Sequence, residues 1–219
     1  MQSVREVGKG LGTVVALVLL VLATLLLVGR LWPAQMLPAA LGATALVEVS
    51  LLWAAWRFGA RPAGAWRAVG MRLPSSPLAY GALPALVLFI SLLSTLLYTQ
   101  AMTWVGLEGL RPTAPTQLLH LEGPLLWVGR IIIVGLGPLA EEAFFRGFVL
   151  GGLAPRLGGA GAAVVSSLLF ALAHLTPGVL APIFILGLLL SWLYLKTRSI
   201  VPGLIAHSAQ NALALLALT

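Results

Sequence analysis

Two glutamates and an arginine stand together in an otherwise apolar chain, in the segment GLGPLAEEAFFRGFVL at residues 135–150. Residues four apart share one face of a helix, so Glu142 and Arg146 can form a charge-assisted pair that neutralises both. Glu141 points about 100° away from Glu142 and has no such partner in its own helix. We therefore expect one carboxylate to support the structure and the other, Glu141, to be free for chemistry.

Two histidines further along the chain are of the residue type that would complete a catalytic site. His174 follows Phe170 by four residues and His207 precedes Asn211 by four, so each pair shares a helix face. A carboxylate in a low-dielectric site can take a proton from water near neutral pH, and imidazole and amide groups can stabilise an oxyanion. Glutamate and two histidines are also a ligand set of catalytic zinc. Glu141, His174 and His207 thus favour water activation, either metal-free or with a divalent metal.

The composition places these groups in a membrane. Of the 219 residues, 60% are hydrophobic and 9% are charged, whereas a soluble domain carries roughly a quarter of its residues as charged. The net charge of +7 comes from Lys and Arg in short loops between apolar runs, which favours contact with lipid headgroups rather than with nucleic acid. The chain has no Cys, so disulfides, thiolate catalysis and Cys-based metal sites are excluded.

Apolar runs of about 20 residues predict an all-α, polytopic membrane protein with about seven transmembrane helices. The runs are Leu11–Val28, Met36–Trp56, Leu78–Thr99, Leu125–Leu153, Ala160–Leu175, Val179–Leu195 and Ile200–Leu218. In the fourth run the GLGP sequence is expected to interrupt the helix, which would restart near Pro138. We divide the chain into an N-terminal region of three spans, residues 1–124, and a C-terminal core of four spans, residues 125–219.

The basic residues predict a cytoplasmic N-terminus, because Lys and Arg are enriched in cytoplasmic loops. The side of the membrane that holds the N-terminus receives Arg5, Lys9, Arg57, Arg61, Arg67, Arg72, Arg156, Lys196 and Arg198, and the other side receives Arg30 and Arg111. The composition is typical of a bacterial gene. Among the remaining polar residues, Glu48 in the second span is expected to pair with a helix neighbour and to have a structural role. His120 lies in a loop and is given no role.

Three motifs, in this order along the chain, resemble those of a known family. EEAFFR (141–146), FALAH (170–174) and HSAQN (207–211) match the EExxxR, FxxxH and HxxxN motifs of the CPBP family, the CAAX proteases and bacteriocin-processing enzymes also called the Abi family. The resemblance implies a polytopic intramembrane protease with its catalytic groups in a membrane-embedded cavity. It implies Glu141, His174, His207 and Asn211 as catalytic residues, and Glu142, Arg146 and Phe170 as site support. Both metal-dependent and metal-free glutamate mechanisms are described for the family, so the cofactor stays open.

The function that follows is an intramembrane endopeptidase that hydrolyses a peptide bond near the C-terminus of a membrane-associated peptide or protein. Its expected partners are the lipid bilayer and a peptide or lipidated protein substrate. Other types of intramembrane protease are excluded, because the chain contains no HExxH sequence, no Asp and no GxSG sequence. Two alternatives stay open: a non-catalytic immunity or scaffold protein of the same fold, and a proton-coupled transporter that uses the same groups as a relay.

Overall fold

The regular structure of this protein is helical throughout the residues that the computed structural model describes, 3–112 and 121–217. In these residues the α-helices are α1 (Val4–Leu31), α2 (Met36–Ala54), α3 (Ala82–Trp104), α4 (Gly123–Ile131), α5 (Gly137–Glu141), α6 (Gly151–Leu172), α7 (Leu180–Thr197) and α8 (Val201–Leu216). Wider, π-helical turns occupy η2 (Ala55–Ala60), η7 (Ile132–Leu136) and η8 (Glu142–Leu150). Short 3-10 helices are η1 (Pro33–Gln35), η3 (Trp66–Val69), η4 (Pro77–Tyr80), η5 (Glu108–Leu110) and η9 (Pro177–Val179). The all-α prediction is confirmed.

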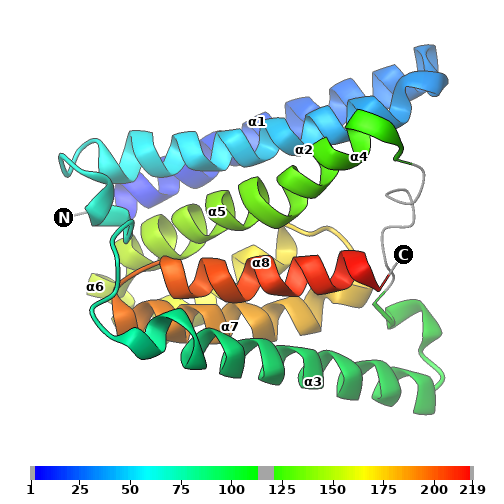
Figure 1. Cartoon of the computed structure of the whole chain (residues 1–219). Coiled ribbons are helices and arrows are strands. Elements are labelled where there is room, and N and C mark those ends of the chain that lie inside the picture. Colours follow the sequence, from blue (N-terminus) through cyan, green and yellow to red (C-terminus); the bar gives the residue numbers. More distant parts are fainter. Residues whose placement is uncertain (1–2, 113–120, 218–219) are drawn as a thin grey trace.

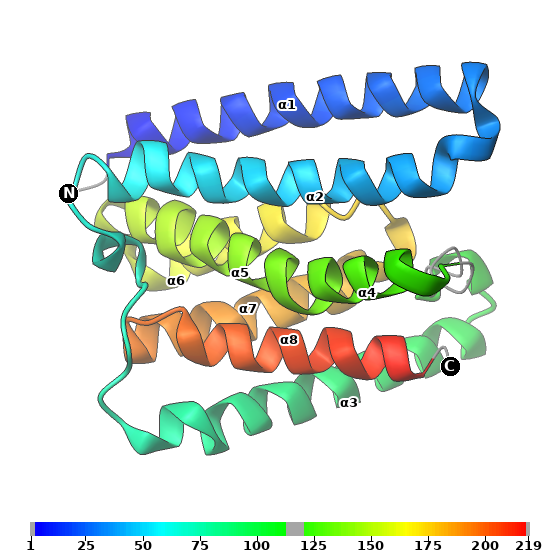
Figure 2. The same cartoon turned by 45° about the horizontal axis from the view of Figure 1, so that its top comes forward.

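The helices form one bundle, in which α1 and α2 lie side by side at one edge and α3 lies at the opposite edge (Figures 1 and 2). The helical segment from α4 to η8 and helices α6, α7 and α8 lie between these edges. α6 packs on α7, while α3 packs on both α7 and α8. Helix α1 begins at one end of the bundle and α8 ends at the other (Figure 2).

Five helical stretches in the described residues are long and apolar enough to cross a membrane. They are Val4–Leu31, Pro33–Ala60, Ala82–Trp104, Gly123–Leu172 and Pro177–Thr197. Two of the seven expected spans lie within Gly123–Leu172, where Gly158 leaves the helical conformation at φ 69° and ψ 169° and separates them. Helix α8 has 16 residues and is shorter than the span of about 20 residues that a bilayer requires. The seven expected spans and the five stretches in the structure therefore differ in how the C-terminal segments are divided and not in the class of fold.

The helix that carries the two glutamates runs through the GLGP sequence, so the expected restart at Pro138 is wrong. α4 continues through the wider turn η7 into α5, and the N–H of Gly137 donates to the carbonyl of Ile132, five residues back. The next donor in this register would be Pro138, which has no N–H. The helix therefore absorbs the proline by widening, and the Ile133 carbonyl depends on a partner from another element.

The loop between α2 and α3 ties the N-terminal helices to the C-terminal ones. Arg72 Nε donates to the carbonyl of Arg198 at 2.7 Å, and the N–H of Ile200 donates to the carbonyl of Gly70 at 3.0 Å. The same loop approaches η8 so closely that a Cβ at Gly147 would lie 2.1 Å from the carbonyl oxygen of Val69. Glycine at position 147 therefore lets this loop pack directly on the helix that carries the glutamates.

Candidate active site

The second glutamate of the pair is an internal structural group. The Arg146 Nη1 lies 2.9 Å from Glu142 Oε1, and the two side chains are 0% and 1% exposed. The contact is ionic, since the two atoms lack the alignment of a hydrogen bond. Gly203 on α8 makes room for it, because a Cβ there would lie 2.5 Å from Glu142 Oε2. The ion pair expected from the four-residue spacing is confirmed.

His207 lies between the two glutamates. Its Nε2 lies 3.4 Å from Glu141 Oε2, and its Nδ1 lies 3.4 Å from Glu142 Oε1. A ring that carries hydrogen on both nitrogens would donate to both carboxylates. The spacing of four residues predicts that His207 and Asn211 share one face of their helix. The position of His207 between Glu141 and Glu142 depends on the packing of α8 against α5 and η7, which no local pattern predicts.

Phe170 is the aromatic centre of the site. Its ring is fully buried, and the guanidinium carbon of Arg146 lies 4.1 Å from the ring centroid. The rings of His174 and His207 meet it edge-on, with centroid distances of 5.0 and 5.7 Å. One aromatic side chain thus contacts the buried cation and both histidines, which explains a phenylalanine four residues before His174.

His174 lies in the turn after α6, and its ring is oriented by the backbone. Nδ1 is 2.9 Å from the carbonyl oxygen of Phe170. Because a carbonyl can only accept, Nδ1 carries a hydrogen, and in the neutral ring Nε2 then has the lone pair. The ring can therefore accept a hydrogen bond at Nε2.

Asn211 donates a hydrogen bond to the backbone carbonyl that has no donor within the widened helix. Its Nδ2 donates to the oxygen of Ile133 at 2.9 Å. This is the carbonyl that would otherwise have met Pro138. One amide N–H of Asn211 is thus used to hold α8 against η7, and the second N–H and Oδ1 are not used in this bond.

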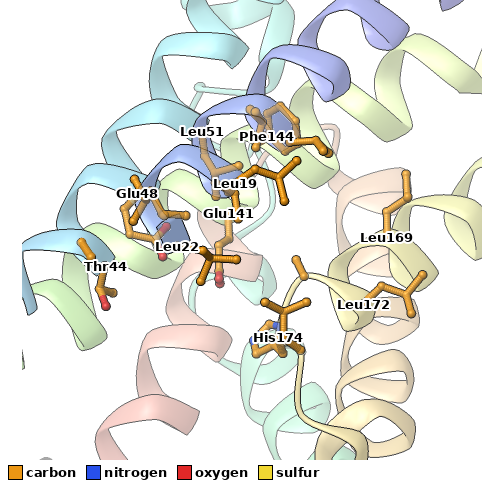
Figure 3. Close-up of a pocket in the computed structure, with 18 of the residues that line it drawn as sticks. Leu19, Leu22, Thr44, Glu48, Leu51, Glu141, Phe144, Leu169, Leu172 and His174 are labelled. Carbon is orange, nitrogen blue, oxygen red and sulfur yellow. The ribbon is translucent and has the colours of Figure 1, made fainter. Parts of the chain in front are cut away.

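A cavity of about 720 Å³ opens beside these residues (Figure 3). Apolar side chains from α1 and α2 form most of its wall, and Leu169, Leu172 and His174 close it from the side of α6. Glu141 lines the cavity and its side chain is 16% exposed, whereas that of Glu142 is 1% exposed. The free carboxylate and the oriented histidine therefore share one space.

Glu48 on α2 lines the same cavity, although a structural role is expected for it from the sequence (Figure 3). Its carboxyl group lies against α5, since a Cβ at Gly137 would be 3.8 Å from its carboxyl carbon. The expected pairing with a helix neighbour is wrong, because the buried Oε2 has no hydrogen-bond partner among the described residues. The sequence feature that could have indicated a role for Glu48 in the site is a lone carboxylate in an apolar span, because such a residue is a functional candidate by default.

The histidines and glutamates do not form a ready ligand set for a metal ion. In residues 3–112 and 121–217, no three His, Cys, Asp or Glu side chains are grouped so that they could hold one. The trio of Glu141, His174 and His207 considered from the sequence is thus not assembled as ligands. Nδ1 of His174 and both nitrogens of His207 are directed at protein oxygens. His120 lies outside the described residues.

The fold and the site together define a polytopic helical membrane protein with a glutamate–histidine centre beside an apolar cavity. Residues 123–213 match the family model of the Rce1-like type II CAAX prenyl endopeptidases. The match to this segment and its three motifs support a resemblance to the CPBP/CAAX family of intramembrane proteases.

A curated relative is the UPF0177 protein YxdF of Lactococcus lactis subsp. lactis (strain IL1403), which is 32% identical over 101 residues. The alignment covers 45% of this chain and 55% of the relative, so the chain spans about half the length of the protein it matches. No solved structure matches the chain. The matched segment of the family model contains all three motifs and begins after α1, α2 and α3.

Proposed function

We propose that this chain is an intramembrane endopeptidase that hydrolyses a peptide bond near the C-terminus of a membrane-associated peptide or lipidated protein. The proposal is supported by the family of residues 123–213 and by the division of roles between the adjacent glutamates. The observation that carries it is that Glu141 faces both the cavity and His207, while Glu142 is buried on Arg146. A carboxylate in such a setting is available to a water molecule and a substrate.

In this proposal Glu141 is the general base. It takes a proton from a water molecule as the water oxygen attacks the scissile carbonyl, and it then delivers that proton to the departing amine. The lone pair of His174 Nε2 accepts a hydrogen bond from the same water and orients it. The low dielectric of the cavity strengthens each of these interactions relative to water.

The negative charge that develops on the carbonyl oxygen needs donors. In the proposal the Nε2–H of His207, which faces Glu141 before the reaction, turns to the oxyanion once Glu141 has taken the proton from water. Asn211 retains an amide N–H beyond the one used on Ile133. Glu142, Arg146 and Phe170 hold the histidines in place. No step of this mechanism uses a metal ion.

The protein would act in a bacterial cell membrane, with its N-terminus in the cytoplasm as the basic loops predict. The cavity lies within the helical bundle, so a substrate would reach it from the lipid phase or from the membrane surface. This setting suits a substrate that already carries an apolar segment or a lipid.

The test is cleavage of a panel of fluorogenic peptides, with and without an attached lipid, by purified protein in lipid nanodiscs. Glu141→Ala and His207→Ala should each lower the cleavage rate by about 10²-fold or more, the range typical of a lost general base or oxyanion donor. Glu122→Ala, at the exposed start of α4, is the control and should keep the wild-type rate. Wild-type cleavage by Glu141→Ala would refute the proposed mechanism.

A further inference from the structure

Each glutamate of the site has a nitrogen-bearing side chain beside it among the described residues, with one exception. Glu142 faces Arg146, and Glu141 faces His207. Glu48 forms no ion pair with any Lys, Arg or His of the described residues. Its main electrostatic neighbour is another carboxylate, Glu141. Among the described residues, Glu48 is therefore the carboxylate of the site without an ion-pair partner.

Burial makes this remaining carboxylate costly. Glu48 is 7% exposed, and its Oε2 has no hydrogen-bond partner among the described residues. A buried charge without a partner opposes folding, and two carboxylates in one low-dielectric space repel each other. A cation or a strong hydrogen-bond donor placed in the cavity would relieve both costs.

The cavity itself indicates what such a ligand looks like. Around Glu48 the wall is mostly apolar, with Leu19 and Leu22 from α1 and Leu51 from α2 (Figure 3). The hydroxyl of Thr44, which also lines the wall, donates to the carbonyl of Ala40 at 3.0 Å. The carboxyl group of Glu48 lies against Gly137, one helical turn before Glu141 on α5. A ligand with an aliphatic body and a positively charged group would place the first among the leucines and the second at the carboxylates.

We propose that Glu48 is a substrate-binding residue that holds a positively charged group of the substrate, with the neighbouring apolar part of the substrate lying between α1 and α2. Lysine, arginine and a terminal ammonium all present this chemistry. Glu48 belongs to α2, outside the segment that matches the family model, so this specificity comes from the N-terminal helices of the chain. The statement that this ligand is a substrate rests on the proposed function. The binding of a positively charged ligand by Glu48 does not rest on it.

Two photoreactive probes test the binding. Each is a long alkyl chain with a diazirine, ending in a primary ammonium in one probe and in a neutral hydroxyl in the other. Purified full-length protein in nanodiscs is labelled with each probe, and mass spectrometry locates the label. We expect the ammonium probe to label residues of the cavity wall more strongly than the hydroxyl probe does.

Three variants assign this preference. Glu48→Gln keeps the size of the side chain and should lower cavity labelling by the ammonium probe about tenfold or more, the effect of losing a charge-assisted bond. Labelling by the hydroxyl probe should stay unchanged, which shows that the cavity is intact. Glu48→Asp should retain the preference, and Glu122→Gln, which removes a charge from the exposed start of α4, should behave as wild type.

Equal labelling by the two probes in the wild type would overturn the proposal, and so would an undiminished ammonium preference in Glu48→Gln. If Glu48→Gln also loses labelling by the hydroxyl probe, the Glu48→Asp variant decides. A retained preference for the ammonium probe in Glu48→Asp supports the proposal, and a lost preference refutes it. The peptide panel separates this result from the proposed function. An ammonium preference without cleavage of any peptide would leave the binding site in place and reject the protease.

Discussion

Removing the buried carboxylate of Glu142 should damage the fold far more than removing the carboxylate of Glu141. In Glu142→Ala the guanidinium of Arg146, which is 0% exposed, loses the counterion that lies 2.9 Å away. Leaving one partner of a buried ion pair uncompensated costs about 3–5 kcal/mol. The ring of Phe170 at 4.1 Å remains and contributes about 2 kcal/mol or more, but it contributes equally in the wild type. We therefore expect a loss of about 3–5 kcal/mol in the free energy of unfolding.

The comparison with Glu141→Ala makes this prediction specific. The Glu141 side chain borders a cavity and is 16% exposed, so its removal should cost about 1 kcal/mol, the net value of an ordinary hydrogen bond. A total stability of about 5–15 kcal/mol is typical of folded domains, so the loss in Glu142→Ala is a large share of it. Folded yield should fall in that variant and stay near wild type in Glu141→Ala.

The assay is unfolding in mixed micelles with increasing SDS, followed by tryptophan fluorescence. A double variant, Glu142→Leu with Arg146→Met, removes both charges and should recover most of the loss, because apolar replacements for a buried ion pair are often neutral. If the unfolding free energy of Glu142→Ala lies within about 1 kcal/mol of wild type, the ion pair does not stabilise the fold as a buried pair should. A double variant less stable than Glu142→Ala would contradict the charge argument as well.

Three other variants test contacts around the site. Gly147→Ala places a Cβ 2.1 Å from the carbonyl of Val69 and should lower stability by about 1–3 kcal/mol, whereas Gly12→Ala, with nothing within 4 Å, should be neutral or stabilising in the same unfolding assay. Asn211→Ala leaves the Ile133 carbonyl without its donor and should cost about 1–3 kcal/mol, measured as a lower unfolding midpoint in SDS. Phe170→Leu removes the aromatic ring that contacts both histidines. We expect kcat in the peptide assay to fall by a larger factor than the loss in unfolding free energy accounts for. An unchanged kcat would show that the ring does not position the two histidines.

The sequence was sufficient for the class of fold and for the position of most helices. Apolar runs of the length of a bilayer leave few structures other than helices that satisfy their own backbone hydrogen bonds. It was insufficient at Pro138, where a missing N–H predicts a break. The break is absent because η7 widens and because Asn211, 78 residues away in sequence, supplies the donor for Ile133. A helix-breaking residue can thus be tolerated through a contact that only tertiary packing creates.

The same distinction applies to the charges of the site. The ion pair of Glu142 and Arg146 follows from a spacing of four along one helix, so the sequence by itself determined it. Packing of α8 on α5 decided the placement of His207 between the two glutamates. Packing of α2 on α5 decided the position of Glu48 in the cavity, where it has no ion-pair partner among the described residues. Sequence spacing determines which side chains of one helix are neighbours, because helical geometry is local. Which charge of another helix faces them depends on packing between segments far apart in the chain, and only the tertiary structure specifies it.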